Sequence, residues 1–208
     1  MNRLSIISYC IIEENTIYKN GEILYKYNSN SPKCFIDEAY SQLGFSYPKF
    51  YKMDNLSKLG WLASEILLKD EQLNERYNSE NIGIVLSNSN ASLDADIHYA
   101  KTINEVPSPA LFVYTLPNIV IGEIAIRNGF KGENAFFVSD NFDALLLQQY
   151  AEMLFASNAV MACICGWVEV LKNEYKCVLY LVEKEDRNLN IEFTEAHLEK
   201  IFNANAER

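Results

Sequence analysis

The sequence TLPNIVIGEIAIRNGFKGENAFFVSDNFDA, residues 115–144, encodes a helix, a short strand and the start of a second helix. Thr115 is a candidate cap for the first helix, whose first turn tolerates Pro117. The residues that follow are apolar around most of the helix, and Gly129 supplies a left-handed stop. We therefore predict a buried helix that ends at Gly129, with Glu123 and Arg127 as a surface ion pair.

The second part of this stretch predicts a strand over residues 135–138 and a helix over residues 143–155. Between them lie Ser139, Asp140 and Asn141, all of which can cap a helix. The helix is apolar except for a stripe made by Gln148, Gln149 and Glu152. This composition predicts a central rather than a peripheral position for the helix.

Several ordered blocks of the sequence resemble the amino-terminal half of β-ketoacyl synthases, which belong to the thiolase-like superfamily. The blocks are Leu116-Pro117-Asn118, Gly122-Glu123-Ile124-Ala125-Ile126-Arg127, Gly129-Phe130-Lys131-Gly132-Glu133-Asn134 and Phe137-Val138-Ser139. Further upstream, Lys52-Met53-Asp54 precedes a predicted helix over residues 56–68, and Ile82-Gly83-Ile84-Val85-Leu86 predicts a strand. The resemblance spans residues 6–183. Within the family, the sequence is similar to the short proteins found with aryl polyene or flexirubin-type pigment gene sets.

The position of the family's nucleophile departs from the family pattern. The resemblance implies a cysteine three residues beyond Ser139, where this sequence has Phe142. A cysteine suits that place because a helix amino terminus favours the thiolate, and the neighbouring backbone amides can hold an oxyanion. Phenylalanine offers no nucleophile, so no catalytic residue is assigned. The resemblance places substrate contacts at Asn141, Phe142 and Asp143.

The family's two catalytic histidines come from a carboxy-terminal half that this sequence does not contain. The only histidines here are His98, in a polar helix that begins near Ser92, and His197, in a terminal helix capped by Thr194. We interpret both as ordinary surface or half-buried residues. Two interpretations of Ser139 remain open: it is one of the capping residues, or it is a serine nucleophile activated by a base that the sequence does not identify.

The cysteine pattern predicts neither disulfides nor a metal site. The five cysteines are an odd number and are scattered without metal-ligand spacing. Cys163 and Cys165 alternate within a predicted strand, so we expect them to face the same side of a sheet as core thiols. We expect no cofactor and no bound metal.

Composition limits the class of protein. A chain of 208 residues with 49% hydrophobic residues predicts a single domain over residues 1–208. Its net charge of −10 argues against nucleic-acid binding. Docking of an acidic acyl carrier protein would need a local basic patch, for which Lys49, Lys52 and Lys58 are the candidates. We find no signal peptide and no apolar run long enough to span a membrane, which predicts a cytoplasmic protein.

The predicted fold is α/β, a thiolase-like half with a mixed five-stranded sheet covered by helices. The five strands are predicted over residues 4–13, 82–87, 135–138, 160–170 and 176–183. The last two form a hairpin, which places one antiparallel strand on an otherwise parallel sheet. A last helix over residues 195–202 has only a narrow apolar stripe of Leu198, Ile201 and Phe202.

The resemblance implies partners, because the two halves of a ketosynthase pack against each other and the strand before the nucleophile pairs across a dimer axis. A lone half would expose apolar surface, which predicts a homodimer or a heterodimer with a full-length ketosynthase. The aromatic run Phe45, Tyr47, Phe50 and Tyr51 would line an acyl tunnel or fill the core.

Three functions follow from these expectations. The first is a non-catalytic accessory protein of fatty-acid or polyketide-type (aryl polyene) biosynthesis, related to 3-oxoacyl-acyl-carrier-protein synthases. The second is an acyl-transfer or hydrolytic enzyme that uses Ser139. The third is an acyl-binding protein that holds a ligand without converting it.

Overall fold

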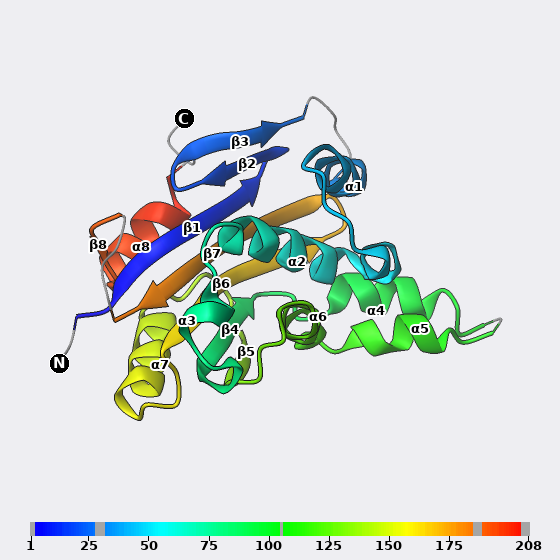
Figure 1. The fold of residues 1–208 in the computed structure, drawn as a ribbon. Helices are drawn as coiled ribbons and strands as arrows, with labels where there is room; N and C mark the ends of the chain where they lie inside the picture. The colour runs from blue at the N-terminus through cyan, green and yellow to red at the C-terminus, as the bar shows by residue number, and fades with distance from the viewer. Residues whose placement is uncertain (1–2, 28–31, 105, 185–188, 205–208) are drawn as a thin grey trace.

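A computed structural model describes residues 3–27, 32–104, 106–184 and 189–204, and these form a sheet with helices on both faces (Figure 1). The strands are β1 Ser5–Glu13, β2 Thr16–Lys19, β3 Glu22–Lys26, β4 Ile82–Asn88, β5 Asn134–Val138, β6 Ala162–Leu171, β7 Glu174–Glu183 and β8 Ile191–Glu192. The α-helices are α1 Pro32–Gln42, α2 Asn55–Leu68, α3 Leu73–Arg76, α4 Leu93–Ala100, α5 Pro109–Phe112, α6 Ile119–Asn128, α7 Ala144–Ala156 and α8 Glu195–Phe202. Three 3₁₀-helices are η1 Pro48–Lys52, η2 Ser79–Asn81 and η3 Val113–Thr115.

The sheet has the strand order β3-β2-β1-β7-β6-β4-β5, and β8 pairs with β1. β4 pairs in parallel with β5 and β6, whereas β7 is antiparallel to both of its neighbours, β6 and β1. This confirms the predicted mixed α/β sheet and the predicted hairpin of its last two long strands. β5 lies at one edge of the described sheet and β3 at the other.

The predicted count of five strands is wrong, because the described residues alone form a sheet of eight. β2 and β3 have only four and five residues, and β8 has two, so none carries a long apolar run. β3 is mostly exposed and therefore lacks the alternation that marks a half-buried strand. Asn20-Gly21, with positive φ at both residues, is the hairpin signal that would have revealed β2 and β3.

Each face of the sheet has its own hydrophobic core. Residues of α1, α2, α4 and α6 pack with one set of strand side chains, and residues of α7 and α8 pack with the other set. Figure 1 shows α2 and α6 in front of the sheet, with α7 and α8 toward its other side. β4 is buried throughout its length, which explains its near-continuous apolar sequence.

The helix α2 is fixed at its start and at its centre. The Asp54 carboxylate accepts a hydrogen bond from the Ser57 amide at 3.0 Å, and burial raises the pKa of Asp54. Gly60 allows α6 to approach, because a Cβ at this position would stand 2.4 Å from Cγ2 of Val120. A side chain here would therefore push the two helices apart.

The helix α6 corrects three details of the sequence prediction. It begins at Ile119 rather than near Thr115, although it ends as predicted at Gly129, which has a φ of 73°. Ile126 is 66% exposed, so the helix is not buried on all sides. The predicted ion pair between Glu123 and Arg127 is wrong: Glu123 is buried and faces the core, whereas Arg127 bonds to a carboxylate of α2.

Most of the aromatic run packs into a core rather than lining a tunnel, whereas Tyr51 is 59% exposed. The rings of Tyr40 and Phe50 stack with centroids 4.0 Å apart, and those of Tyr47 and Trp61 stack at 5.4 Å. Lys58 lies over the Phe50 ring at 5.2 Å. The rings therefore occupy one another's contact surfaces, and the space of a tunnel is taken by their own packing.

The predicted basic patch does not form as a free surface. Lys58 is buried and its Nζ lies 2.7 Å from a carboxylate oxygen of Asp37. Lys49 is 2.7 Å from a carboxylate oxygen of Glu123. Lys52 is exposed, whereas the other two predicted cations form ion pairs within the described part of the fold.

Candidate functional site

The predicted site lies at the carboxyl-terminal ends of β4 and β5, where the chain turns into α7. The amide of Ser139 donates a hydrogen bond to the carbonyl oxygen of Asn88 at 2.9 Å, which joins the two strand ends. A small hollow of about 320 Å³ opens there. It is lined by Ser139, Asp140, Asn141, Phe142, Asp143, Ala144 and Leu145, together with Glu195 and Glu199 of α8.

The Phe142 side chain is held by aromatic residues from two other elements. Its ring stacks on the ring of Phe202 of α8, with centroids 4.1 Å apart and planes 3° from parallel. The Trp167 indole of β6 lies nearly perpendicular to both rings, with its centroid 6.2 Å from each of theirs. Lys176 of β7 lies 4.2 Å from the centroid of Phe202. The position at which the family resemblance implies a nucleophile is therefore occupied by packed rings.

Capping of α7 falls to a different residue than predicted. Asp143 is the N-cap, and its carboxylate accepts a hydrogen bond from the Leu146 amide at 2.8 Å. Ser139, Asp140 and Asn141 stand earlier, in the loop between β5 and α7, so their predicted capping role is wrong. The helix itself begins at Ala144, one residue later than predicted.

The charge around Ser139 does not favour a nucleophile. Asp140, Asp143, Glu195 and Glu199 all line the same hollow, and no basic side chain is among the residues described there. Nearby carboxylates disfavour the formation of an alkoxide or an oxyanion. Ser139 shares the hollow with Phe142, as predicted, but none of the lining residues is a histidine that could act as its base.

Neither histidine is among the residues that line this hollow, and both make local contacts. In α4, Nδ1 of His98 is 2.7 Å from the carbonyl oxygen of Asp94. In α8, Nδ1 of His197 is 3.0 Å from Oγ1 of Thr194 and 2.9 Å from the carbonyl oxygen of Glu192. These contacts fix one ring nitrogen of each histidine to its own helix or helix start, which agrees with an ordinary structural role.

The helix α8 is anchored to the sheet next to the hollow. The hydroxyl of Tyr180, a fully buried residue of β7, donates a hydrogen bond to the carbonyl oxygen of Leu198 at 2.8 Å. Burial raises the pKa of Tyr180. Leu198 and Ile201 are buried in the same core. Sequence reasoning missed the contribution of Trp167, Phe202 and Lys176 to the site, because nothing local in the sequence links residues of three separate elements.

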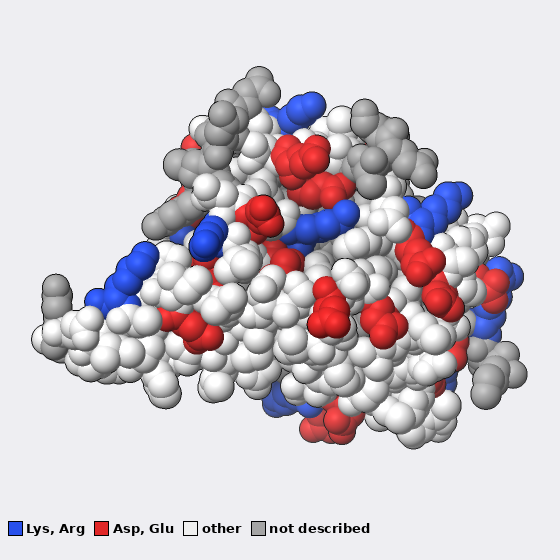
Figure 2. All heavy atoms as spheres, turned by 180° about the vertical axis from the view of Figure 1, so that it is seen from behind, with Lys and Arg blue, Asp and Glu red and all other residues white. Residues whose placement is uncertain are grey.

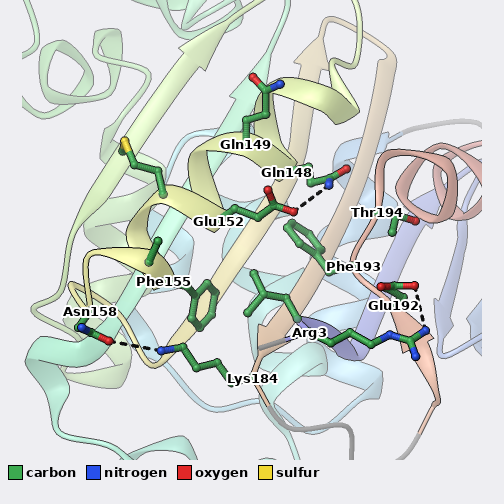
Figure 3. Close-up of a pocket in the computed structure, with 13 residues that line it drawn as sticks. Arg3, Gln148, Gln149, Glu152, Phe155, Asn158, Lys184, Glu192, Phe193 and Thr194 are labelled. Atoms are coloured by element: carbon green, nitrogen blue, oxygen red, sulfur yellow. Dashed lines mark hydrogen bonds and ion pairs between the residues drawn. The ribbon is translucent and has the colours of Figure 1, made fainter. Parts of the chain in front are cut away.

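A larger groove, of about 830 Å³, lies along the carboxyl-terminal part of α7 (Figure 3). Its floor includes Leu4, Phe155 and Phe193, which are largely buried. Its lining is completed by Arg3, Gln148, Gln149, Glu152, Met153, Ala156, Asn158, Lys184, Glu192 and Thr194. Figure 3 shows polar side chains around the aromatic floor. The described lining combines this apolar floor with charged and amide side chains at the rim, a composition typical of sites that hold a small ligand.

The described cysteines are core thiols. Cys163 and Cys165 are fully buried in the core beneath α7 and α8, which confirms that they face the same side of the sheet. Burial raises the pKa of Cys163 to about 12 and that of Cys165 well above its usual value. Among the residues that the structure describes, no group of three or more histidine, cysteine or acidic side chains could hold a metal ion.

Comparison with known proteins gives matches to solved structures alone. No model of a known protein family matches the sequence, and no curated protein matches it significantly. The ishigamide ketosynthase/chain length factor is 18% identical with a TM-score of 0.65, over 87% of this chain and 62% of that chain. A β-ketoacyl synthase from Burkholderia phymatum is 11% identical with a TM-score of 0.58, over 89% of this chain and 60% of that one.

The fold is that of a ketosynthase amino-terminal half. At such identities the comparison establishes the thiolase-like fold alone, and the chain spans about three fifths of the length of these two relatives. A third match is a ketosynthase in complex with its chain length factor from Xenorhabdus doucetiae, at 11% identity and a TM-score of 0.56. It covers 88% of this chain and 80% of the matched chain, which is therefore of similar length.

Proposed function

We propose that this chain is a non-catalytic accessory subunit of a ketosynthase-type assembly, comparable to a chain length factor, in fatty-acid or polyketide-type (aryl polyene) biosynthesis. The observation that carries the proposal is the packing of Phe142. A phenylalanine stands at the family's nucleophile position, and Phe202 and Trp167 close the space around it. An acyl thioester would find no nucleophile at position 142, and the stacked rings of Phe142 and Phe202 occupy the space beside it.

The surroundings of Ser139 support the same conclusion. Acyl transfer by a serine requires a base within hydrogen-bond reach and donors for the oxyanion. The hollow offers carboxylates from α8 and from the loop, with both histidines bonded elsewhere. The second function, an enzyme that uses Ser139, is therefore less well supported than the first.

The proposed partner is a full-length ketosynthase, with a second copy of this chain as the alternative. β5 lies at the edge of the described sheet, and an edge strand can pair with another chain. The family resemblance implies that this strand pairs across a dimer axis. The similar length of a chain matched within a ketosynthase and chain length factor complex supports a heterodimer. One domain, a cytoplasmic location and independence of cofactors remain predictions.

The test is a condensation assay with purified proteins. The chain would be incubated with acyl-loaded and malonyl-loaded carrier protein, alone and with a cognate full-length ketosynthase, and intact-protein mass spectrometry would follow the products. We expect no acyl transfer by the chain alone, and a changed rate or product length when it accompanies the ketosynthase. The Ser139→Ala variant serves as the matched control and should behave as the wild-type chain does.

Turnover by the chain alone, lost in Ser139→Ala, would replace this proposal with the enzyme hypothesis. If the ketosynthase neither binds the chain nor changes its products, the accessory role fails. Size-exclusion chromatography of each protein and of their mixture separates these cases, because it reports binding independently of chemistry.

The groove along α7 (Figure 3) favours a second candidate function, the binding of an acyl ligand. Its volume of about 830 Å³ lies within the range of small-molecule sites, and its floor is apolar. Native mass spectrometry of the purified chain, with and without added palmitate, tests this. A bound adduct that is lost when Ala156→Trp fills the groove would support it, and no adduct would leave the accessory role alone.

A further inference from the structure

The segment between β4 and α6 forms a projection that we call the apolar arm: α4, α5 and η3 with the described residues joining them, 93–104 and 106–116. Figure 1 shows α4 and α5 side by side, extending away from the body of the molecule. The rings of Tyr99 and Phe112 pack with centroids 5.4 Å apart, which joins the two helices. The arm is therefore a folded unit with side chains of its own at the surface.

The surface of the arm is unusually apolar. Ile103, Val106, Phe112, Val113 and Leu116 are all about half exposed or more, with Val106 at 81%. The sequence contains no charged residue from 106 to 122. Figure 2 shows the face of the arm that is turned from the viewer in Figure 1, and it carries few charged side chains. Large clustered apolar surface of this kind marks an interaction site.

The base of the arm is fixed rather than loose. The Tyr114 hydroxyl donates a hydrogen bond to the buried Glu123 carboxylate at 3.1 Å, and Lys49 pairs with the same carboxylate. The Ser92 hydroxyl donates to the carbonyl oxygen of Thr115 at 2.7 Å, which ties the start of the arm to its end. A preorganised apolar surface loses little conformational entropy when it docks.

The arm also emerges beside the candidate site. It follows the carboxyl-terminal end of β4, and the last residue of β4, Asn88, bonds to Ser139 at the end of β5. The arm and the hollow around Phe142 are therefore attached to the same end of the same two strands. β5, next to them, is the edge of the described sheet. A partner that contacts the arm comes close to both.

Charge separates a protein partner from a membrane. No single described helix is long and apolar enough to cross a membrane. Two consecutive helical segments, Pro109–Thr115 and Ile119–Asn128, reach that length and apolar composition only when taken together, and they are bent by 101° relative to each other. Membrane-surface segments depend on lysine and arginine to attract anionic lipid. This chain has a net charge of −10, and the described residues of the arm contain one lysine, Lys101, against two aspartates, Asp94 and Asp96. The observations favour an apolar protein surface.

We propose that the apolar arm is the principal docking surface for the ketosynthase-type partner, and that it seats Phe112, Val113 and Val106 in an apolar depression of that subunit. This inference rests on the proposed function, because that function supplies the partner. It assigns the contact to an element outside the β5 edge, and it places the partner's surface next to Phe142.

The test compares two variants with equally exposed side chains. Phe112 is 57% exposed on the arm, and Ile23 is 58% exposed on β3, at the opposite edge of the sheet from β5. Binding of Phe112→Asp and Ile23→Asp to the cognate full-length ketosynthase would be measured by biolayer interferometry. We expect Phe112→Asp to raise the Kd at least tenfold and Ile23→Asp to change it less than twofold. The milder Val106→Ser should weaken binding in the same direction.

Thermal unfolding of every variant, followed by circular dichroism, distinguishes lost contact from lost fold. If Phe112→Asp and Val106→Ser bind like the wild-type chain, the arm is not the docking surface, while the accessory role stands. If the wild-type chain does not bind the ketosynthase, the proposed function fails instead. Arm-dependent sedimentation with phosphatidylglycerol and phosphatidylcholine vesicles, without ketosynthase binding, would overturn the inference in favour of a membrane.

Discussion

Two regions of this molecule handle apolar surface in opposite ways: the α7–α8 face of the sheet and the apolar arm. On the α7–α8 face, the chain covers itself, because Leu198 and Ile201 of α8 are buried against the sheet. The outer side of α8 carries Glu195, Glu199 and Lys200, which are exposed. The arm instead leaves Val106 and its neighbours exposed.

The difference shows where a partner is needed. The family resemblance predicts an uncovered face where the other half of a ketosynthase would pack, but the described face carries charged residues of α8 on its outer side. Exposed apolar side chains also occur singly on α7 (Leu145 and Met153) and on β3 (Ile23 and Leu24), but the arm gathers the largest number of them in one short segment. The predicted need for a partner therefore concerns the arm, while the closed face depends on contacts inside the chain.

The largest effect should follow from opening the closed face. Leu198 is fully buried between α8 and the sheet, so Leu198→Ala removes contacts and leaves a cavity. We expect a loss of about 2–5 kcal/mol in the free energy of unfolding, measured by urea denaturation. The matched change on the arm, Val113→Ala, should cost less than about 0.5 kcal/mol because this side chain is already half exposed.

Equal losses in the two variants would contradict the comparison, since they would mean that the arm contributes as much to folding as α8 does. A small loss in both would mean that α8 lies loosely on the sheet. Either result would remove the distinction between a self-covered face and a surface kept for a partner.

The next effect concerns the aromatic packing over Phe142. We expect a cysteine introduced by Phe142→Cys to react slowly with iodoacetamide, because Phe202 covers the position. Adding Phe202→Ala should raise the labelling rate about tenfold, as a covered thiol becomes accessible. Mass spectrometry of the labelled peptide gives the rate at position 142, and the wild-type chain gives the background.

Equal labelling with and without Phe202 would mean that the ring stack does not close the site. The physical account of the lost nucleophile would then rest on the replacement of cysteine alone. The accessory function would survive that result, but its dependence on α8 would not.

Much of the frame could be predicted from local sequence. The strands β4 and β6, the hairpin to β7 and the stop of α6 at Gly129 all have strong periodic or turn signals. The replacement of the family's cysteine by Phe142 could be predicted from the family resemblance alone. These features are predictable because neighbours in sequence decide them: a buried strand requires apolar residues, and a left-handed stop favours glycine.

The rest depended on contacts between distant residues. Glu123 was expected on the surface because it lies four residues before Arg127, yet it is buried because Tyr114 and Lys49 reach it from other elements. The closure of the site depends on Phe142, Phe202 and Trp167, from three separate elements. Helix periodicity describes one element at a time, so it cannot foresee which side of a helix meets a distant partner.

A smaller effect should appear when the α7–α8 core is titrated. Burial raises the pKa of Cys163 from 9.0 to about 12, so the folded chain keeps this proton after the unfolded chain has lost it. The stability from this thiol is complete below pH 9 and falls as the pH rises toward about 12. Between pH 7 and pH 10, the free energy of unfolding of Cys163→Ala should fall by about 1 kcal/mol less than that of the wild-type chain. Urea denaturation at each pH measures both values.

Identical pH dependence in the two chains would mean that Cys163 is more accessible than the closed face requires. The contrast between a closed α7–α8 face and an exposed arm would then be weaker. The difference between the two curves reports Cys163 together with its effect on Cys165, whose pKa is raised by burial and by the Cys163 thiolate.

The smallest effect belongs to the base of the arm. Tyr114→Phe removes one hydrogen bond to Glu123 while Lys49 still pairs with that carboxylate, so we expect a loss of about 0.5–1.5 kcal/mol at neutral pH by urea denaturation. Burial and the Glu123 carboxylate raise the pKa of Tyr114, so its contribution is present below its usual pKa of 10 and is lost as the pH rises further. Above pH 10 the free energies of unfolding of the variant and the wild-type chain should therefore converge.

Binding to the ketosynthase gives a second readout for the same variant. If Tyr114→Phe binds the ketosynthase more weakly while its stability barely changes, Tyr114 holds the arm in position for docking. Unchanged binding would mean that the arm needs only its apolar side chains.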